Sequence, residues 1–422
     1  MIDDFRGSRP KKPAKKFLTP KPPAKQEKPA DEPGFKTPEQ VAAQESGLSL
    51  PLELPDAPVK GKKPWYKQLK PRLSWPPTKM EYLCGLGVLI LLAVGVWGFH
   101  ALHHSKPPVI HKAAKVVKKA VQPTTVPSTL TGLPVDPSVN LRPVTGVMIE
   151  NSVDARPQSS LGQAGVVFEA VAEGGVTRFL ALFQDTQPDN IGPIRSARPY
   201  YIQWALGFDA GYAHVGGSPD GLQDIKDWGV RDLDQFFNAG AYHRTSDRYA
   251  PHNVYTSIAA LNQLEASKGY NSSNFTGFVR KKEVKPKQPT VTAIDFAISG
   301  PTYNAHYDYN APTNSYLRSE AGSPHIDANT NTQIAPKVVI ALIVPKSQGA
   351  LDASGAYYSE YAVVGSGAAY IFQDGAVTTA TWQKAGNASQ ITFTDSSGKT
   401  VGLDPGQTWL TALANSGEVT YH

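Results

Sequence analysis

Four arginines occur in a stretch of the chain that is otherwise poor in positive charge. They are Arg156, Arg178, Arg195 and Arg198. A guanidinium group holds a carboxylate or a phosphate through two parallel hydrogen bonds, so this set predicts recognition of an anionic ligand. The alternative is internal pairing, in a buried ionic scaffold, with one of the nearby acids Glu150, Glu169, Glu173 or Asp209.

A glycine-rich turn follows in the sequence AHVGGSPDGLQDI. Gly216, Gly217 and Ser218 stand between an expected strand and a helix that Pro219 would begin. Backbone N–H groups at such a helix entry attract anions, because the helix dipole lies behind them. Ser218 as an ordinary N-cap explains the same pattern without a ligand. Ser218 does not lie in a G-x-S-x-G motif, which argues against a serine hydrolase.

Histidines and glutamates offer a possible acid–base site. The candidates are His214, His243 and His252, with the acids Glu150, Glu169 and Glu173. Two carboxylates that flank a sugar bond would be glycosidase chemistry, but Glu169 and Glu173 are expected on the same side of one strand. The sequence contains no H-E-x-x-H or comparable metal-binding spacing, so we expect neither a metal nor a cofactor.

The elements that would position these residues begin with a hairpin. Residues 166–173 and 176–183 read as two strands joined by Gly174-Gly175, which tolerates the positive φ of a tight turn. Pairing Glu173 with Val176 would put Glu169, Glu173 and Arg178 on one face and Phe168, Phe179 and Phe183 on the other. Helices are expected over residues 199–206, 219–228 and 258–268.

The remainder predicts an α+β fold of layered β-sheets with a few helices, in two modules. Residues 140–290 form the first module, and KKEVKPKQP (281–289) reads as the joint. Residues 291–422 form a β-rich module, since short apolar runs such as 338–344 and 408–413 alternate with Gly, Asn, Asp and Ser.

A single transmembrane helix is predicted over residues 82–102. Leu83 to Leu102 reads LCGLGVLILLAVGVWGFHAL, and its only ionisable groups are Cys84 and His100. About 20 apolar residues are enough to span a bilayer. Neither a cleavable signal peptide nor a lipid-modified cysteine fits, because a long charged region precedes the run and Cys84 stands near its start. As the chain has one cysteine, it forms no intramolecular disulfide.

The flanks of this run differ from the rest of the chain in charge. Residues 1–139 carry 22 of the 42 Lys and Arg but 11 of the 36 Asp and Glu, so the remaining residues are net acidic. That split argues against a globular nucleic-acid binder. We expect residues 1–81 to be a disordered, Pro-rich, basic tail in the cytoplasm and residues 103–139 a Pro-rich stalk. The protein would then hold its folded region outside the cytoplasmic membrane.

Several of these motifs together resemble one known family. GVMIENSVDARPQSSLGQAGVVFEAVAEGGVTRFLALF, GPIRSARPYY, AHVGGSPDG, AYIFQDGAVTTATWQK and GLDPGQTW resemble, in this order, the YerB-like family of bacterial cell-envelope proteins. The resemblance covers roughly residues 140–422 and implies both family modules and an extracytoplasmic location. Many family members are lipoproteins, and this chain departs from them by its apolar helix. The resemblance implies no reaction; the positions that match its signature are Glu150, Asn151, Arg156, Glu173, Arg178, Arg195, Ser196, Arg198, His214 and Ser218.

These observations favour a non-catalytic envelope protein that binds an anionic cell-wall ligand or a protein partner in wall synthesis. Its candidate ligand-binding residues are Arg156, Arg178, Arg195, Arg198, Gly216, Gly217, Ser218, His214, Glu150, Asn151, Glu169 and Glu173. The first alternative is a cell-wall hydrolase that uses Glu and His as acid and base. The second is that every motif serves the fold. The sequence does not indicate an oligomeric state.

Overall fold

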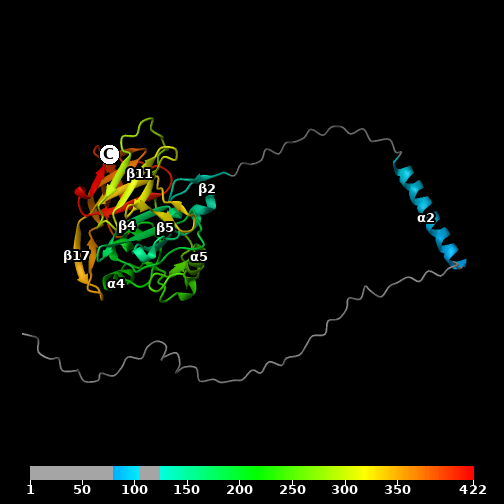
Figure 1. Cartoon of the computed structure of the whole chain (residues 1–422), viewed down its shortest axis with the longest axis horizontal. Helices are drawn as coiled ribbons and strands as arrows, with labels where there is room; N and C mark the ends of the chain where they lie inside the picture. Colours follow the sequence, from blue (N-terminus) through cyan, green and yellow to red (C-terminus); the bar gives the residue numbers. More distant parts are fainter. Residues whose placement is uncertain (1–78, 104–123) are drawn as a thin grey trace, which may run out of the picture. The chain divides into compact units, whose positions relative to one another are not determined.

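The computed structural model describes residues 79–103 and 124–422. Nearly all of the predicted tail and much of the predicted stalk lie outside these residues. The chain divides into two units, residues 1–115 and 116–422 (Figure 1). In the first unit, the apolar run lies within helix α2 (Lys79–His103). Among the described residues, no helix combines the length and the hydropathy that crossing a membrane requires.

The folded unit begins before residue 140. Strands β1 (Val126–Pro127) and β2 (Pro134–Val135) pair, and the 3-10 helix η2 (Pro137–Leu141) follows. Leu130 is fully buried, and Oγ of Ser128 donates a 2.7 Å hydrogen bond to Asp185. These residues were predicted to lie in the stalk because prolines favour extended linkers. One buried leucine and a few polar contacts instead attach the segment to the fold.

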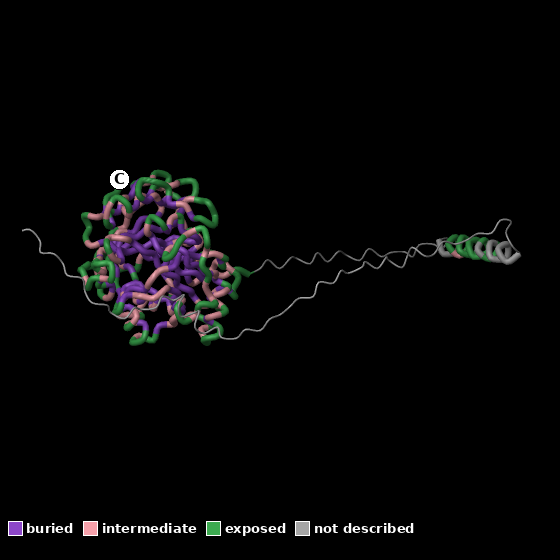
Figure 2. The backbone as a smooth tube through the Cα atoms, turned by 60° about the horizontal axis from the view of Figure 1, so that its bottom comes forward, coloured by how far each residue is buried: buried purple, intermediate pink, exposed green. Residues whose placement is uncertain are grey.

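A 12-stranded mixed sheet forms the centre of the folded unit, where buried residues concentrate (Figure 2). The N-terminal region supplies β3 (Thr145–Glu150), β4 (Val166–Glu173), β5 (Val176–Phe183), β6 (Gly211–Ala213) and β7 (Arg231–Asp232). The C-terminal region supplies β16 (Val338–Ile343), β17 (Lys346–Leu351), β18 (Tyr357–Tyr361), β19 (Gly365–Gln373), β20 (Ala376–Lys384), β21 (Thr392–Asp395) and β22 (Thr408–Leu413). Strand β22 pairs in parallel with β16 and with β4, so both predicted modules share this sheet.

The hairpin of β4 and β5 has the predicted turn but a different register. Gly174 and Gly175 both have positive φ, at 56° and 83°, which glycine adopts without steric cost. Glu173 lies opposite Val176 as predicted. The register then shifts between Val171 and Glu173, because a β-bulge adds a residue to one strand.

This bulge makes the predicted common face of Glu169, Glu173 and Arg178 wrong. Arg178 lies opposite Ala170, while Glu169 lies opposite Phe179 on the other face of the sheet. A shift of one residue moves the following side chains to the opposite face. Glu173 lies beyond the bulge and therefore still meets Arg178, but Glu169 is separated from both.

Different elements cover the two faces of the hairpin. Helix α3 (Pro199–Leu206) covers the face of Phe168, whose ring stacks on Trp204 at 4.8 Å between centroids. On the other face, Phe179 meets Trp409 at 5.4 Å. A five-stranded sheet packs there, in the order β13 (Ser323–Pro324), β12 (Ser315–Glu320), β11 (Ala305–Asn310), β10 (Ala293–Phe296) and β23 (Val419–Tyr421). Phe168 and Phe179 thus lie on opposite faces, contrary to the prediction.

Helices α4 (Pro219–Asp227) and α5 (Ile258–Ser267) confirm the other two predicted helices. The short elements are η3 (Val153–Ala155), η4 (Leu161–Gln163), η5 (Ala239–Ala241), β8 (Tyr242–Arg244), β9 (Val254–Thr256), β14 (Ile326–Asp327), β15 (Thr332–Gln333) and η6 (Ser416–Glu418). From residue 291 onward the described chain contains strands and one 3-10 helix. The predicted α+β fold with a β-rich C-terminal region is therefore confirmed.

Candidate functional site

Two of the four predicted arginines pair with one glutamate inside the fold. Nη2 of Arg178 and Nη2 of Arg198 contact opposite oxygens of the Glu173 carboxylate. Both arginines are buried, and the guanidinium of Arg198 lies 4.9 Å from the centre of the Tyr358 ring. Nη1 of Arg178 donates to the carbonyl of Ser196 over 3.0 Å. These contacts favour a scaffold role for the three charged residues, because their polar atoms already have partners within the fold.

Arg156 and Asn151 lie apart from that group, against the C-terminal region. Nη2 of Arg156 is 3.3 Å from Oε1 of Glu320, and Nδ2 of Asn151 donates to the same oxygen over 2.6 Å. Nε of Arg156 donates to Oδ1 of Asn151 over 3.0 Å. The group therefore joins the end of β3 to the end of β12.

Glu169 is fully buried and binds an arginine that the sequence reasoning did not consider. Nη2 of Arg318 donates to both carboxylate oxygens of Glu169, over 2.8 and 3.0 Å. Nε1 of Trp409 donates to Oε2 over 2.9 Å, and the Trp409 ring lies 4.8 Å from the Arg318 guanidinium. Both charged side chains are fully buried. A carboxylate enclosed in this way is not accessible to a ligand.

Three side chains contact the same carboxylate oxygen of Glu150. Oε1 accepts a 2.8 Å hydrogen bond from Oγ of Ser152 and lies 3.0 Å from Nδ1 of His252. Nε of Arg195 is also 3.0 Å away, although without the alignment of a hydrogen bond. Nε2 of His252 lies 4.0 Å from the exposed Asp154. An imidazole that a carboxylate holds through Nδ1 keeps Nε2 for proton transfer, so this group has acid–base potential.

His214 follows β6 and connects the glycine-rich turn to β7. Its Nδ1 lies 2.7 Å from the carbonyl of Gly216, and its Nε2 lies 3.0 Å from Oδ1 of Asp232. The ring is fully buried. Burial acts to raise the pKa of Asp232, but the hydrogen bonds from His214 and from the amide of Asp234, together with the nearby positive charges, outweigh it, and the pKa lies below its usual value. Asp232 therefore carries its charge at neutral pH.

The backbone donors of the turn are largely engaged within the fold. The amide of Gly216, at a φ of 57°, donates to Oδ1 of Asp234 over 3.0 Å. The amide of Ser218 donates to the carbonyl of Ala197 over 3.2 Å. Oγ of Ser218 accepts from the amide of Gly221 over 3.2 Å. Ser218 therefore acts as an ordinary N-cap, which was the alternative prediction, and few backbone N–H groups of the turn remain free to bind an anion.

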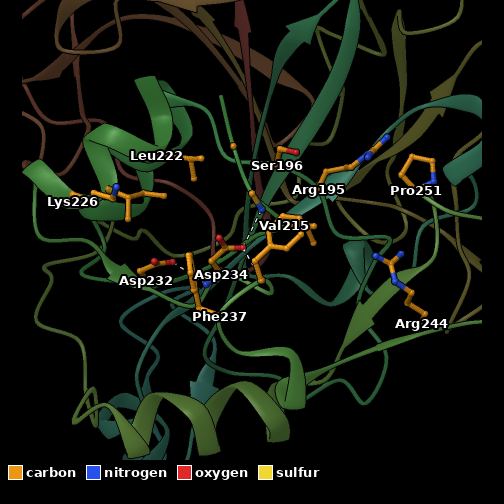
Figure 3. Close-up of a pocket in the computed structure, with 14 residues that line it drawn as sticks. Arg195, Ser196, Val215, Leu222, Lys226, Asp232, Asp234, Phe237, Arg244 and Pro251 are labelled. Carbon is orange, nitrogen blue, oxygen red and sulfur yellow. Dashed lines mark hydrogen bonds between the residues drawn. The ribbon is translucent and has the colours of Figure 1, made fainter. Parts of the chain in front are cut away.

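A pocket of about 630 Å³ opens beside this turn (Figure 3). Its charged lining residues are Arg195, Lys226, Asp232, Asp234 and Arg244. Its apolar lining residues are Val215, Leu222, Ile225, Phe236, Phe237 and Pro251, and Ser196, Gly216 and Gly217 complete it. We call it the Phe237 pocket. Ligand pockets commonly have volumes of about 300–1,000 Å³. Of the predicted site residues, the pocket includes Arg195, Gly216 and Gly217, while Ser218 and His214 do not line it.

Sequence reasoning missed the two phenylalanines that line the pocket. Phe236 and Phe237 are 67% and 83% exposed, in the segment between β7 and η5. The signal was present, because DLDQFFNAG places two adjacent aromatic residues among turn-forming polar residues. Strand and helix periodicity does not detect such a pair. Lys226, Asp232, Asp234 and Arg244 were also missed, because single charged residues on short elements and turns have no spacing that marks a site.

Comparison with known proteins shows one consistent likeness. Residues 130–271 match the N-terminal domain of a protein of unknown function (DUF3048), and residues 294–410 match its C-terminal domain. YerB of Bacillus subtilis (strain 168), which is named as a candidate lipoprotein, is 30% identical over 285 residues, 67% of this chain and 84% of YerB. The crystal structure of the YerB protein superimposes with a TM-score of 0.61 at 27% identity, covering 71% of this chain and 99% of that one. The chain therefore belongs to the YerB-like family and contains both of its domains.

Proposed function

We propose that this chain is a membrane-anchored protein of the bacterial cell envelope whose folded unit lies outside the cytoplasmic membrane. The name of the B. subtilis relative supports an envelope location. Helix α2 has 25 residues, which at about 1.5 Å each exceeds the roughly 30 Å of a hydrocarbon core. Among its described side chains, Leu91 and Trp97 are 73% and 77% exposed, and lipid would cover them. We assign the single crossing to this helix on the apolar sequence Leu83 to Leu102, part of which lies outside the side chains that the structure describes.

The basic tail supports the orientation. Seventeen Lys and Arg precede Leu83, whereas five follow Leu102 before the folded unit. Positive charge is retained on the cytoplasmic side of a membrane, so the N-terminus is placed inside. Fusing a reporter active only in the cytoplasm to either end tests this topology. Activity at the C-terminal end would reverse the assignment.

The folded unit then serves to bind an anionic ligand of the cell wall, without catalysing a reaction on it. The observation that carries this proposal is the lining of the Phe237 pocket. Lys226 and Arg244 are exposed there, and within the described residues neither lies in an ion pair with a carboxylate. Exposed cations beside exposed aromatic rings suit a ligand that carries both negative charge and apolar surface.

Co-sedimentation with purified cell-wall sacculi tests the binding function. The full chain in lipid nanodiscs should sediment with the sacculi, and the double variant Lys226→Gln/Arg244→Gln should remain largely in solution. Lys399→Gln removes an exposed cation elsewhere and serves as the matched control. Equal sedimentation of wild type and double variant would contradict the proposed site, and no sedimentation at all would contradict the function.

The hydrolase alternative has one observation in its favour, the contact between Glu150 and His252. It requires that His252 accept a proton from water, that the water oxygen attack an ester or amide carbon, and that the leaving group take the proton. Release of products from sacculi, followed by chromatography, tests this. Product that forms with wild type but falls by about 100-fold in His252→Gln would establish hydrolysis. Product yields that match a protein-free control would exclude it under those conditions.

A further inference from the structure

We infer that the Phe237 pocket takes an acidic amino sugar, a pyranose ring that carries a carboxylate and an acylated amine. This inference rests on the proposed binding function and adds the class of ligand and its orientation. Three features of the pocket carry it: an end with two arginines, two exposed aromatic side chains, and an opposite end with an acceptor.

The arginine end is made by Arg195 and Arg244. Both lie on the same side of the pocket as Pro251 (Figure 3). Nη1 of Arg244 donates to Oδ1 of Asn253 over 2.7 Å, and the rest of its guanidinium is available on the exposed side chain. The Arg195 side chain is 24% exposed, and Glu150 offsets its charge from behind. Two guanidinium groups on one side fit a carboxylate that each can contact through N–H groups.

Phe236 and Phe237 provide an apolar surface that the fold leaves uncovered. The Phe236 ring packs against the turn, since a Cβ on Gly216 would meet its Cε2 at 3.0 Å. Most of both side chains nevertheless remains in solvent. Covering exposed aromatic surface is favourable, and the C–H face of a pyranose is a flat apolar surface of suitable size. A charged ligand without such a face would leave both rings exposed.

The opposite end holds Lys226 and Asp232 (Figure 3). Oδ1 of Asp232 accepts from His214 and from the amide of Asp234. Its side chain is 36% exposed, so the carboxylate can also accept from a ligand. A hydroxyl or an amide N–H of a sugar would donate to it, and Lys226 would donate to a sugar oxygen. The pocket therefore orients its ligand with the carboxylate at the arginine end.

Two related classes of wall ligand fit less well. A neutral amino sugar leaves the exposed Arg244 without an anion. A phosphate-linked glycerol polymer supplies anions but has no ring face for the two phenylalanines. N-acetylmuramic acid and N-acetylglucosamine form a matched pair of probes, because they differ by one lactyl ether group that ends in a carboxylate.

Calorimetric titration of the full chain in nanodiscs with each sugar, and with glycerol phosphate, tests the inference. N-acetylmuramic acid should bind at least about tenfold more tightly than N-acetylglucosamine, since a charge-assisted contact contributes that much. Arg244→Gln, an exposed position, should reduce this preference to near unity. Phe237→Ala should weaken the binding of both sugars, and Lys399→Gln should change neither.

Equal affinity for the two sugars, a preference that persists in Arg244→Gln, or binding of glycerol phosphate alone would each overturn the inference. If sacculi still sediment the protein in those cases, the proposed binding function stands and only the ligand class is wrong. If neither sugar binds and the protein does not sediment with sacculi, both the ligand class and the proposed binding function are wrong.

Discussion

At the scale of single residues, Glu265 differs from Glu150, Glu169 and Glu173 because no cationic side chain of the described residues lies in ion-pair contact with it. It lies on α5 and is fully buried. Oγ1 of Thr145 donates to Oε2 over 3.0 Å, while Oε1 has no hydrogen-bond partner among the described residues. Burial raises the pKa of Glu265 to about 8. At neutral pH this carboxyl group is therefore largely protonated, and it belongs to the core rather than to a site.

The stability of the protein should consequently fall as the pH rises from about 4.5 to about 8. Between these values the folded state holds a proton on Glu265 that the unfolded chain has released. Glu265→Gln should lose less stability than wild type over this interval, by up to a few kcal/mol. Guanidinium unfolding at pH 5 and pH 8.5 measures it, with the exposed Glu360→Gln as control. Parallel pH profiles for Glu265→Gln and wild type would contradict the assignment.

The pair of Glu169 and Arg318 gives a second prediction at this scale. Arg318→Met should lower the free energy of unfolding by roughly 3–5 kcal/mol, because it leaves a buried carboxylate without its partner. Glu169→Leu combined with Arg318→Met should cost clearly less than the sum of the two single variants. A double-mutant cycle by chemical unfolding measures the coupling. Additive effects would mean that the two charges do not stabilise each other.

At the scale of elements, a substitution at the N-cap of α4 distinguishes a structural role of Ser218 from a role in ligand binding. Ser218→Ala should lower stability by about 1 kcal/mol, since the amide of Gly221 loses its acceptor. Ser257 caps α5 in the same way, and Ser257→Ala is the matched control. Both variants should keep the sacculus binding of wild type. Loss of binding in Ser218→Ala alone, without a change in stability, would favour the anion cradle that the sequence suggested.

Local sequence signals predicted the elements well where a single turn or cap decides them. Gly174-Gly175 placed the hairpin, and Pro199 and Ser218 placed the starts of α3 and α4. The bulge before Glu173 has no local signal in the sequence, and Glu173 also pairs with Tyr358, a residue far away in the chain. Faces that were assigned by counting residues were therefore wrong beyond it.

The candidate site was predictable only in part, for a related reason. Arg195 and the Gly216 turn line the pocket, but most of the other candidates pair with acids or with other parts of the fold. The partner of Glu169 lies 149 residues away in the chain, and that of Arg156 lies 164 residues away. Sequence spacing carries no information on such distant contacts. Phe236 and Phe237 were not predicted because they lie in a loop, which has no periodic sequence pattern.

At the scale of the whole molecule, the two family domains share one mixed sheet and one buried core. Strand β4 pairs with β22 and β18 of the C-terminal region, as well as with β5. Arg318 and Trp409 of the C-terminal region donate hydrogen bonds to the buried carboxylate of Glu169. Glu320, also of that region, forms an ion pair with Arg156 and accepts a hydrogen bond from Asn151. The pocket lies within the N-terminal domain, yet the sheet that supports it is completed by strands from beyond residue 291.

A chain truncated after residue 290 should therefore fail to fold, although it retains every residue of the Phe237 pocket. Strand β4 would become an unpaired edge, and the buried Glu169 carboxylate would lose both Arg318 and Trp409. Limited proteolysis and near-ultraviolet circular dichroism would report the loss, and co-expression of residues 291–422 should restore protease resistance and sacculus binding. A truncated chain that unfolds in a sharp cooperative transition and still binds sacculi would show instead that the N-terminal domain is autonomous. The strand pairs between the domains would then be an interface rather than part of a single core.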